Sequence, residues 1–189
     1  MRPLQKSCFS RTRRARRFSL ALFLFPLFCS CMAPHRIPSI QEAQLIENVP
    51  FFPQGKNQCG PASLASVLNY WGIALSPQEI SAAIWSPGAR GTLDLDMVMY
   101  AQRKGLIAQQ YAGTVEDLKR NIHEKIPLIV LVDEGFWIYQ RDHFMVVIGY
   151  NPKGLIVHSG KEARHPIPWA DFLRTWERTK FWTLRISPP

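Results

Sequence analysis

The chain has 189 residues, a length that favours a single domain after processing, and a formal net charge of +9. Its first 31 positions hold seven basic residues and no acidic ones, which leaves a charge of only +2 for the remainder. The basic character therefore belongs to the N-terminal segment, and it gives no reason to expect a nucleic-acid-binding domain.

The first 30 residues have the order of a signal peptide. A basic region ends at Arg17, and an apolar segment follows over residues 18–28, interrupted by Pro26. This segment is short for a transmembrane helix, which needs about 20 apolar residues. We predict a signal peptide over 1–30, a tether over 31–44 and one domain over 45–189.

Cys31 is the predicted site of lipid attachment. It follows the small residue Ser30 and the apolar pair Leu27–Phe28, which resembles a bacterial lipobox, although Phe28 departs from the usual small aliphatic residue. Met32, rather than aspartate, follows the cysteine and favours the outer membrane. We predict an outer-membrane lipoprotein facing the periplasm; the alternatives are a soluble secreted or periplasmic protein and an uncleaved anchor. All of them place the domain outside the cytoplasm.

The first part of the domain has the pattern of helices. Leu64, Val67, Leu68 and Trp71 recur at helical spacing within a predicted helix over 60–71, with Pro61 in its first turn and Gly72 as its stop. Residues 76–79 read Ser-Pro-Gln-Glu, a capping box that begins a second helix ending near residue 85. Further helices are predicted over 93–104, 114–125 and 168–177.

The second part of the domain has the pattern of an antiparallel sheet. A continuous apolar run over 127–132 predicts a buried strand. Strands over 143–150 and 155–159 are joined by Asn-Pro-Lys-Gly, which predicts a hairpin. Other strands or extended segments are predicted over 45–52, 107–111 and 181–186. Helices followed by antiparallel strands indicate an α+β fold.

Cys59 is the candidate nucleophile. Cys8 and Cys29 leave with the signal peptide and Cys31 is the predicted lipid site, so Cys59 has no partner for an intramolecular disulfide. A lone cysteine is often a small buried hydrophobe, but this one stands at the start of a predicted helix. Unpaired N–H groups and the helix dipole lower the pKa of a thiol there, so we expect a reactive Cys59. Gln54, five residues upstream, has the amide expected of an oxyanion donor.

His143 is the predicted partner of Cys59. It stands where an aromatic loop enters an apolar strand, a position that holds the ring while leaving one edge open. Imidazole takes the thiol proton, the ion pair holds the thiolate ready, and imidazolium later protonates the leaving amine. The other histidines are less suitable: His35 in the tether, His123 on a charged helix face, His165 in a Pro-flanked loop, and His158 in the sheet.

Three blocks of the chain resemble the bacteriocin-processing type of papain-like cysteine peptidase. They are Val-Pro-Phe-Phe-Pro-Gln over 49–54, Cys-Gly-Pro-Ala-Ser-Leu-Ala over 59–65 and His-Phe-Met-Val-Val-Ile-Gly-Tyr over 143–150. The resemblance implies a papain-like fold, with helices packed on an antiparallel sheet. It also implies Cys59 as nucleophile, His143 as general base and acid, and Gln54 as oxyanion donor.

The resemblance also bears on the substrate. The best-known members of the family that the chain resembles are domains of membrane export ATPases, and they cut leader peptides after paired glycines. No exporter segment accompanies this domain, so we predict a peptide or protein substrate without that specificity. The signal peptide makes the chain more similar to stand-alone bacterial lipoprotein relatives.

Ser159 marks a departure from the family pattern. An Asp-Pro usually ends the strand after the histidine strand and orients the imidazole, but here Ser159 falls on the Asp position. A hydroxyl can accept the imidazole N–H, yet it carries no charge to stabilise imidazolium. Asp142 is a poor substitute because adjacent strand residues point to opposite faces. Glu162 could approach His143 if Tyr150 pairs with Leu155.

We therefore expect a cysteine peptidase that needs no cofactor. The alternatives are a catalytically weak or inactive peptide-binding module of the same fold, and a thiol-dependent acyltransferase. Asp94 and Asp96 lie close together, as ligands of a metal ion would. They open a helix, however, where acidic residues interact favourably with the helix dipole, so we predict no metal site. Trp137 and Tyr139 are expected either to border a substrate cleft or to pack in an ordinary loop.

Overall fold

The computed structural model describes residues 43–89 and 91–189. The predicted signal peptide, Cys31 and His35 lie outside the described residues. The described part combines helices with a seven-stranded antiparallel sheet, in the order β4-β9-β5-β6-β7-β8 with β1 paired to β6. This architecture confirms the predicted α+β class. None of the described helices is long and apolar enough to span a membrane.

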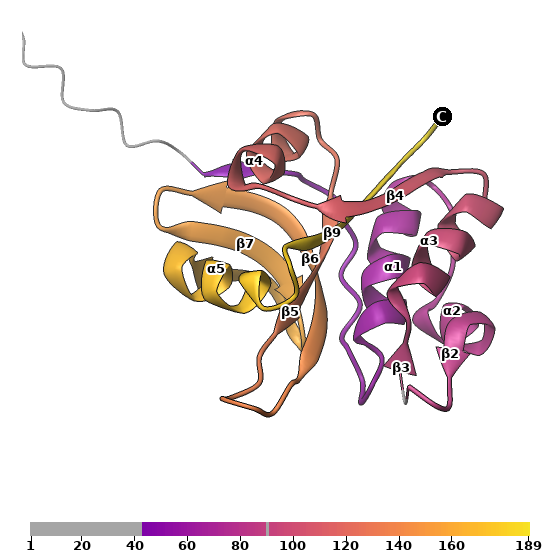
Figure 1. Cartoon of the computed structure of the whole chain (residues 1–189). Coiled ribbons are helices and arrows are strands. Elements are labelled where there is room, and N and C mark those ends of the chain that lie inside the picture. Colours follow the sequence, from indigo (N-terminus) through magenta and orange to yellow (C-terminus); the bar gives the residue numbers. More distant parts are fainter. Residues whose placement is uncertain (1–42, 90) are drawn as a thin grey trace, which may run out of the picture. The chain divides into compact units, whose positions relative to one another are not determined.

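Helices α1 (Cys59–Tyr70), α2 (Pro77–Ile84) and α3 (Asp94–Arg103) pack together, and Figure 1 shows them grouped at one side of the sheet. Leu64, Val67 and Leu68 of α1 are fully buried, as their spacing predicts. Gly72 follows α1 with a φ of 83°, a conformation that glycine adopts without steric cost. The predicted capping box is present at Ser76 and Glu79.

The sheet follows the predicted strands closely. The strand bounds are β1 Gln44–Leu45, β4 Ile107–Ala112, β5 Leu128–Asp133, β6 Asp142–Asn151, β7 Gly154–Ser159, β8 Glu162–Pro168 and β9 Trp182–Ser187. Helices α4 (Val115–His123) and α5 (Trp169–Glu177) cover part of it, and α5 packs on β5 and β7. Phe172 and Trp176 of α5 are fully buried against the core. Together these contacts fix the strands on which the candidate site stands.

Three strands were missing from the predicted set. Strand β8 covers the segment around His165 that the sequence predicts as a loop, and a short hairpin of β2 (Trp85–Ser86) and β3 (Gly91–Thr92) follows α2. Pro166 and Pro168 conceal β8, because proline cannot donate a ladder hydrogen bond. Proline is tolerated here because β8 is the edge strand of the described sheet.

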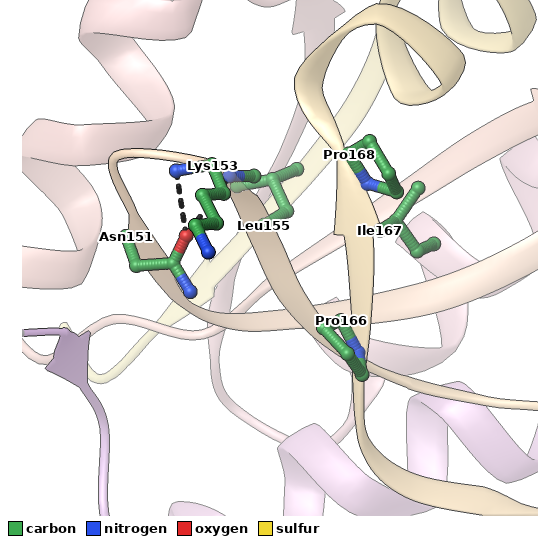
Figure 2. A pocket seen from close by; sticks show the side chains of 7 residues that line it. Asn151, Lys153, Leu155, Pro166, Ile167 and Pro168 are labelled. Atoms are coloured by element: carbon green, nitrogen blue, oxygen red, sulfur yellow. Dashed lines mark hydrogen bonds between the residues drawn. The ribbon is translucent and has the colours of Figure 1, made fainter.

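The β6–β7 hairpin forms as predicted. The side-chain oxygen of Asn151 accepts hydrogen bonds from the backbone N–H groups of Lys153 and Gly154, at 2.8 and 3.0 Å. Figure 2 shows this turn beside a largely apolar pocket that Leu155 and the end of β8 complete. The turn also sets the register, with Tyr150 opposite Leu155.

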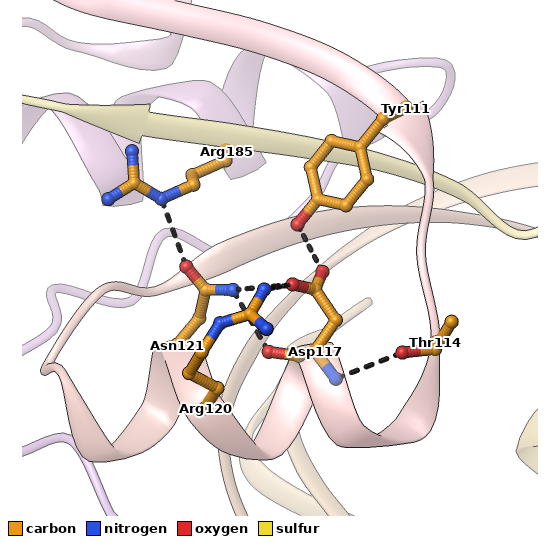
Figure 3. Close-up of polar contacts among 6 residues, drawn as sticks. All are labelled: Tyr111, Thr114, Asp117, Arg120, Asn121 and Arg185. Carbon is orange, nitrogen blue, oxygen red and sulfur yellow. Dashed lines mark hydrogen bonds and ion pairs between the residues drawn. The ribbon is translucent and has the colours of Figure 1, made fainter.

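Helix α4 is fastened to the sheet by a buried polar cluster (Figure 3). The Tyr111 hydroxyl donates to the carboxylate of Asp117, and Arg185 donates through Nε to the side-chain oxygen of Asn121 at 3.0 Å. Burial, followed by the hydrogen bond to Asp117, raises the pKa of Tyr111 above its ordinary value. A buried carboxylate is costly unless it is hydrogen-bonded, so this cluster helps to fix α4 on β4 and β9.

Candidate active site

Cys59 is the first residue of α1 and lines a pocket that also contains His143. The loop before the helix turns sharply, with Asn57 in the left-handed region at a φ of 59°. The pocket is lined by Gln54, Gly55, Lys56, Asn57, Cys59, Arg141, Asp142, His143 and Gly160. The fold therefore brings together two segments that lie more than eighty residues apart in sequence.

The thiol of Cys59 is not the low-pKa group that its helix position predicts. Burial raises the pKa of Cys59 above its ordinary value, and the negative charge of Glu134 adds slightly to this. The backbone N–H groups of Phe144, Gly60 and Cys59 itself lower the pKa, but burial has the larger effect. The expectation of a lowered pKa was wrong because sequence shows the helix start but not how deeply the sulfur lies.

His143 stands near the beginning of β6, opposite Val132 of β5. Its Nε2 atom lies 2.9 Å from the hydroxyl oxygen of Ser159, so the serine at the family's aspartate position does contact the ring. Nδ1 is then the nitrogen available to exchange a proton with Cys59 or a substrate. Burial lowers the pKa of His143 below its ordinary value; Glu134 acts to raise this pKa and Arg141 to lower it.

The raised thiol pKa and the lowered imidazole pKa have one consequence. Near neutral pH, both Cys59 and His143 are uncharged at rest, instead of forming the predicted thiolate–imidazolium pair. A nucleophilic attack by this thiol therefore requires that a proton leave the sulfur during the attack itself. This arrangement suits general-base catalysis by His143, in which proton transfer accompanies nucleophilic attack.

Gln54 is held beside the two predicted catalytic residues by a set of hydrogen bonds. Its Oε1 accepts from the backbone N–H of Gly160 at 3.0 Å, and its own backbone N–H donates to the Gly160 carbonyl at 2.8 Å. Its Nε2 donates to the Phe144 carbonyl at 3.2 Å and approaches the Ser63 hydroxyl at 3.4 Å. The amide nitrogen therefore faces the α1–β6 junction, but it already has partners there.

The alternative carboxylates are engaged elsewhere. Tyr150 does pair with Leu155, yet Glu162 directs its carboxylate to Nδ1 of His165 at 2.5 Å. Asp142 accepts a hydrogen bond from the Gln140 side chain at 2.9 Å. Neither group contacts His143, which leaves Ser159 as its hydrogen-bond partner among the described residues.

The remaining candidates from sequence do not line the pocket of Cys59. His158 is buried, with Nε2 at 3.1 Å from the Val49 carbonyl, and Asp94 and Asp96 stand in the first turn of α3 as predicted. Trp137 and Tyr139 are 83% and 71% exposed, so ordinary loop packing was the wrong alternative for them.

Sequence reasoning missed two charged groups near His143. Glu134 and Arg141 line a second pocket together with His143 and Ser159. Their place depends on the pairing of β5 with β6, which brings the two ends of the intervening loop together. A correct prediction of the register between β5 and β6 would have placed Glu134 and Arg141 near His143.

Comparison with protein families gives a match over residues 46–183, which spans most of the chain. The chain belongs to the Peptidase_C39 like family. The match begins directly after β1, ends within β9 and covers both segments of the pocket. No curated protein matches the chain.

Solved structures of C39-type peptidases share the fold of this C39-like chain. A protein described as a C39-like peptidase from Bacillus anthracis has a TM-score of 0.64 at 16% identity, covering 79% of this chain and 99% of the other. The peptidase domain of Streptococcus ComA has a TM-score of 0.62 at 23% identity, covering 75% and 99%. A double glycine motif protease from an AMS/PCAT transporter, solved with its leader peptide, has a TM-score of 0.61 at 24% identity, covering 79% and 100%. The chain thus has the fold of the papain-like C39 peptidases.

Proposed function

We propose that this C39-like protein is a cysteine peptidase that hydrolyses peptide bonds with Cys59 and His143. One observation carries the proposal: Cys59 and His143 line one pocket, and the Ser159 hydroxyl lies 2.9 Å from Nε2 of the same imidazole. A nucleophile, a base and a group that orients the base are the arrangement required for nucleophilic catalysis.

In the proposed reaction, Nδ1 of His143 accepts the thiol proton while the sulfur of Cys59 attacks the scissile carbonyl carbon. The carbonyl oxygen becomes an oxyanion, which the backbone N–H at the start of α1 and Nε2 of Gln54 stabilise. Because Nε2 now donates to Phe144 and approaches Ser63, it must redirect or share one hydrogen. The intermediate collapses as imidazolium protonates the leaving amine, and a water molecule then hydrolyses the thioester.

The proposed substrate is a peptide or an exposed segment of a protein. The transporter protease with a similar fold was solved in complex with a leader peptide, which supports a peptide as the substrate class. Four consecutive exposed hydrophobic side chains, Phe136 to Tyr139, lie in the middle of the loop between β5 and β6, and we propose that they contact the substrate. Double-glycine specificity is not included in the proposal.

We also propose that the domain acts in the cell envelope. The basic segment, the apolar segment and Cys31 support export followed by lipid attachment at Cys31 and location at the outer membrane, facing the periplasm. Mass spectrometry of the mature N-terminus tests this part. We expect a mature N-terminus at a lipid-modified Cys31. Cleavage at another position, without lipid, would contradict the lipoprotein proposal and indicate a soluble periplasmic or secreted protein.

A peptide-library digest tests the catalytic proposal. Wild type is expected to cleave, while Cys59→Ala and His143→Ala are expected to lose cleavage. Ser81→Ala on α2, which contributes no residue to the pocket of Cys59, is the matched control and should cleave normally. Adding an amine acceptor separates hydrolysis from acyl transfer, since only acyl transfer yields a conjugate. No cleavage by wild type under any condition would refute peptidase activity.

A binding module is the second candidate, and the uncharged Ser159 is the observation that favours it. Ser159→Asp restores a carboxylate beside Nε2 of His143, where a charge-assisted hydrogen bond is stronger than a neutral one. Cleavage by Ser159→Asp alone would show that the natural protein binds peptides without cutting them effectively. Cleavage by both proteins supports the peptidase.

A further inference from the structure

His143 acquires a positive charge when it takes the proton of Cys59, and its hydrogen-bond partner Ser159 contributes no compensating charge. A negative charge nearby would lower the free energy of that state. The titratable and charged groups of the two pockets that His143 lines come from the loop before α1, α1 itself, both ends of the β5–β6 loop, β6, the β7–β8 turn and β8. They are Lys56, Cys59, Glu134, Arg141, Asp142, Lys161, Glu162 and His165.

Most of the acidic groups in this set are committed to other partners. The carboxylate of Glu162 lies on His165, and that of Asp142 accepts from Gln140. Asp142 also neighbours His143 in the strand, so the two side chains leave β6 on opposite faces. The third acidic side chain of the set, Glu134, forms only a long ion pair with Arg141, and it is the one that remains to act on the imidazole.

The strand register places Glu134 on the same face as His143. Val132 pairs with His143 and Asp133 with Asp142, and the backbone N–H of Glu134 continues the ladder by donating to the Arg141 carbonyl at 2.9 Å. Glu134 is therefore the diagonal cross-strand neighbour of His143. Such neighbours are about 7–8 Å apart, within reach of long side chains. Glu134, His143 and Ser159 line one pocket.

We propose that Glu134 is a positioning residue that acts through His143, supplying the negative charge that Ser159 lacks, while Arg141 opposes it. This inference rests on the proposed peptidase function. The ion pair between Arg141 Nε and Glu134 Oε2 is long, at 3.9 Å, and the guanidinium side chain is 70% exposed. Such a pair neutralises Glu134 only in part, because solvent screens exposed charges strongly. The negative charge of Glu134 therefore still interacts with the imidazole of His143.

The directions of the pKa shifts of His143 and Cys59 agree with this geometry. The charge of Glu134 raises the pKa of His143 and of Cys59, whereas that of Arg141 lowers the pKa of His143. Glu134 thus favours the protonated forms of both residues. It suppresses the resting thiolate and stabilises the imidazolium that forms during attack.

The decisive experiment measures the ionisation of His143 by NMR, from the pH dependence of its ring C–H shifts. The full chain with Cys59→Ala is used, and His143→Gln assigns the signal. Glu134→Gln is expected to lower the pKa of His143, because imidazolium loses a favourable charge. Arg141→Gln is expected to raise it. Glu116→Gln, an exposed charge change on α4, is the matched control and should leave it unchanged.

Opposite shifts for the two substitutions support the inference, because a loss of local structure would not reverse sign between them. An unchanged pKa in Glu134→Gln, or shifts of one sign in both variants, overturns it. Because these measurements do not depend on catalysis, a failure of this inference can be distinguished from a failure of the proposed peptidase function. With active protein, Glu134→Gln should move the acidic limb of kcat/KM to lower pH and reduce the plateau by about tenfold.

Discussion

Replacing Ser159 with alanine tests whether the hydroxyl holds the imidazole of His143, the proposed catalytic base. The substitution removes the oxygen that lies 2.9 Å from Nε2 of His143, while the strand and the pocket keep their backbone. The ring is then free to turn about its side-chain bonds, and the nitrogen that Ser159 contacted is left without a protein partner. Both effects disfavour the geometry in which Nδ1 faces the thiol.

The magnitude follows from the strength of one hydrogen bond. A neutral intramolecular hydrogen bond contributes about 1 kcal/mol net, and one to a charged group about 1.5–3 kcal/mol. Only the part that strengthens when imidazolium forms affects the rate, and the difference between these values is about 1 kcal/mol. We therefore expect kcat/KM of Ser159→Ala to fall by about fivefold, since tenfold corresponds to 1.36 kcal/mol.

The assay is kcat/KM across pH on a peptide from the library digest, with Ser81→Ala as the matched substitution outside the site. Circular dichroism melting of both variants separates a catalytic effect from a loss of folding. A Ser159→Ala protein with wild-type kcat/KM at every pH would refute this reasoning. It would show that packing alone orients His143.

Three further outcomes are expected. Because burial raises the pKa of Cys59, the rate of alkylation by iodoacetamide should keep rising above pH 8.5, and a midpoint below pH 8 would contradict the neutral resting pair. Gln54→Ala should lower kcat by roughly 100-fold if the amide stabilises the oxyanion, with Gln78→Ala on α2 as the control; a change in KM alone would limit Gln54 to binding. Burial also lowers the pKa of His158, so stability should be full above the unfolded pKa of about 6.5 and decrease as the pH falls below it. Melting temperatures between pH 8 and pH 5 check this, and an equal loss in His158→Gln would exclude His158 as the cause.

Local chemistry explains why the helices were predictable from sequence. Ser76 and Glu79 cap α2, Thr114 caps α4, and Gly72 follows α1, each through contacts within a few residues. These features need no knowledge of the rest of the fold. Their bounds agree with the structure to within one or two residues.

The edge strand β8 shows where local reasoning fails. Pro166 and Pro168 are turn and loop residues by composition, and only the order of strands in the sheet makes them acceptable at an edge. Glu134 was missed for a related reason: its approach to His143 is fixed by the register of two strands joined by a long loop. Sequence patterns predict strands better than the pairing between them.

The ionisation of the candidate site illustrates the same limit in chemical terms. The helix start at Cys59 and its backbone N–H groups correctly predict interactions that lower the pKa of the thiol, and such interactions are present. The net direction is nevertheless upward, because desolvation of a buried sulfur outweighs them. Burial is a property of the folded chain, so the sequence could identify the residues but not their resting charges.

A neutral resting thiol also suits the proposed location of the domain. Thiolate is the form that oxidants attack, and Cys59 has no disulfide partner among the described residues. In an oxidising envelope compartment, a nucleophile that stayed ionised would be lost to oxidation more readily than one that remains protonated until substrate arrives. The partly buried pair of Cys59 and His143 is therefore less reactive at rest, but it is also less readily oxidised. In the proposed mechanism it then depends on nearby groups, Ser159 by hydrogen bonding and Glu134 by charge, to stabilise the imidazolium during attack.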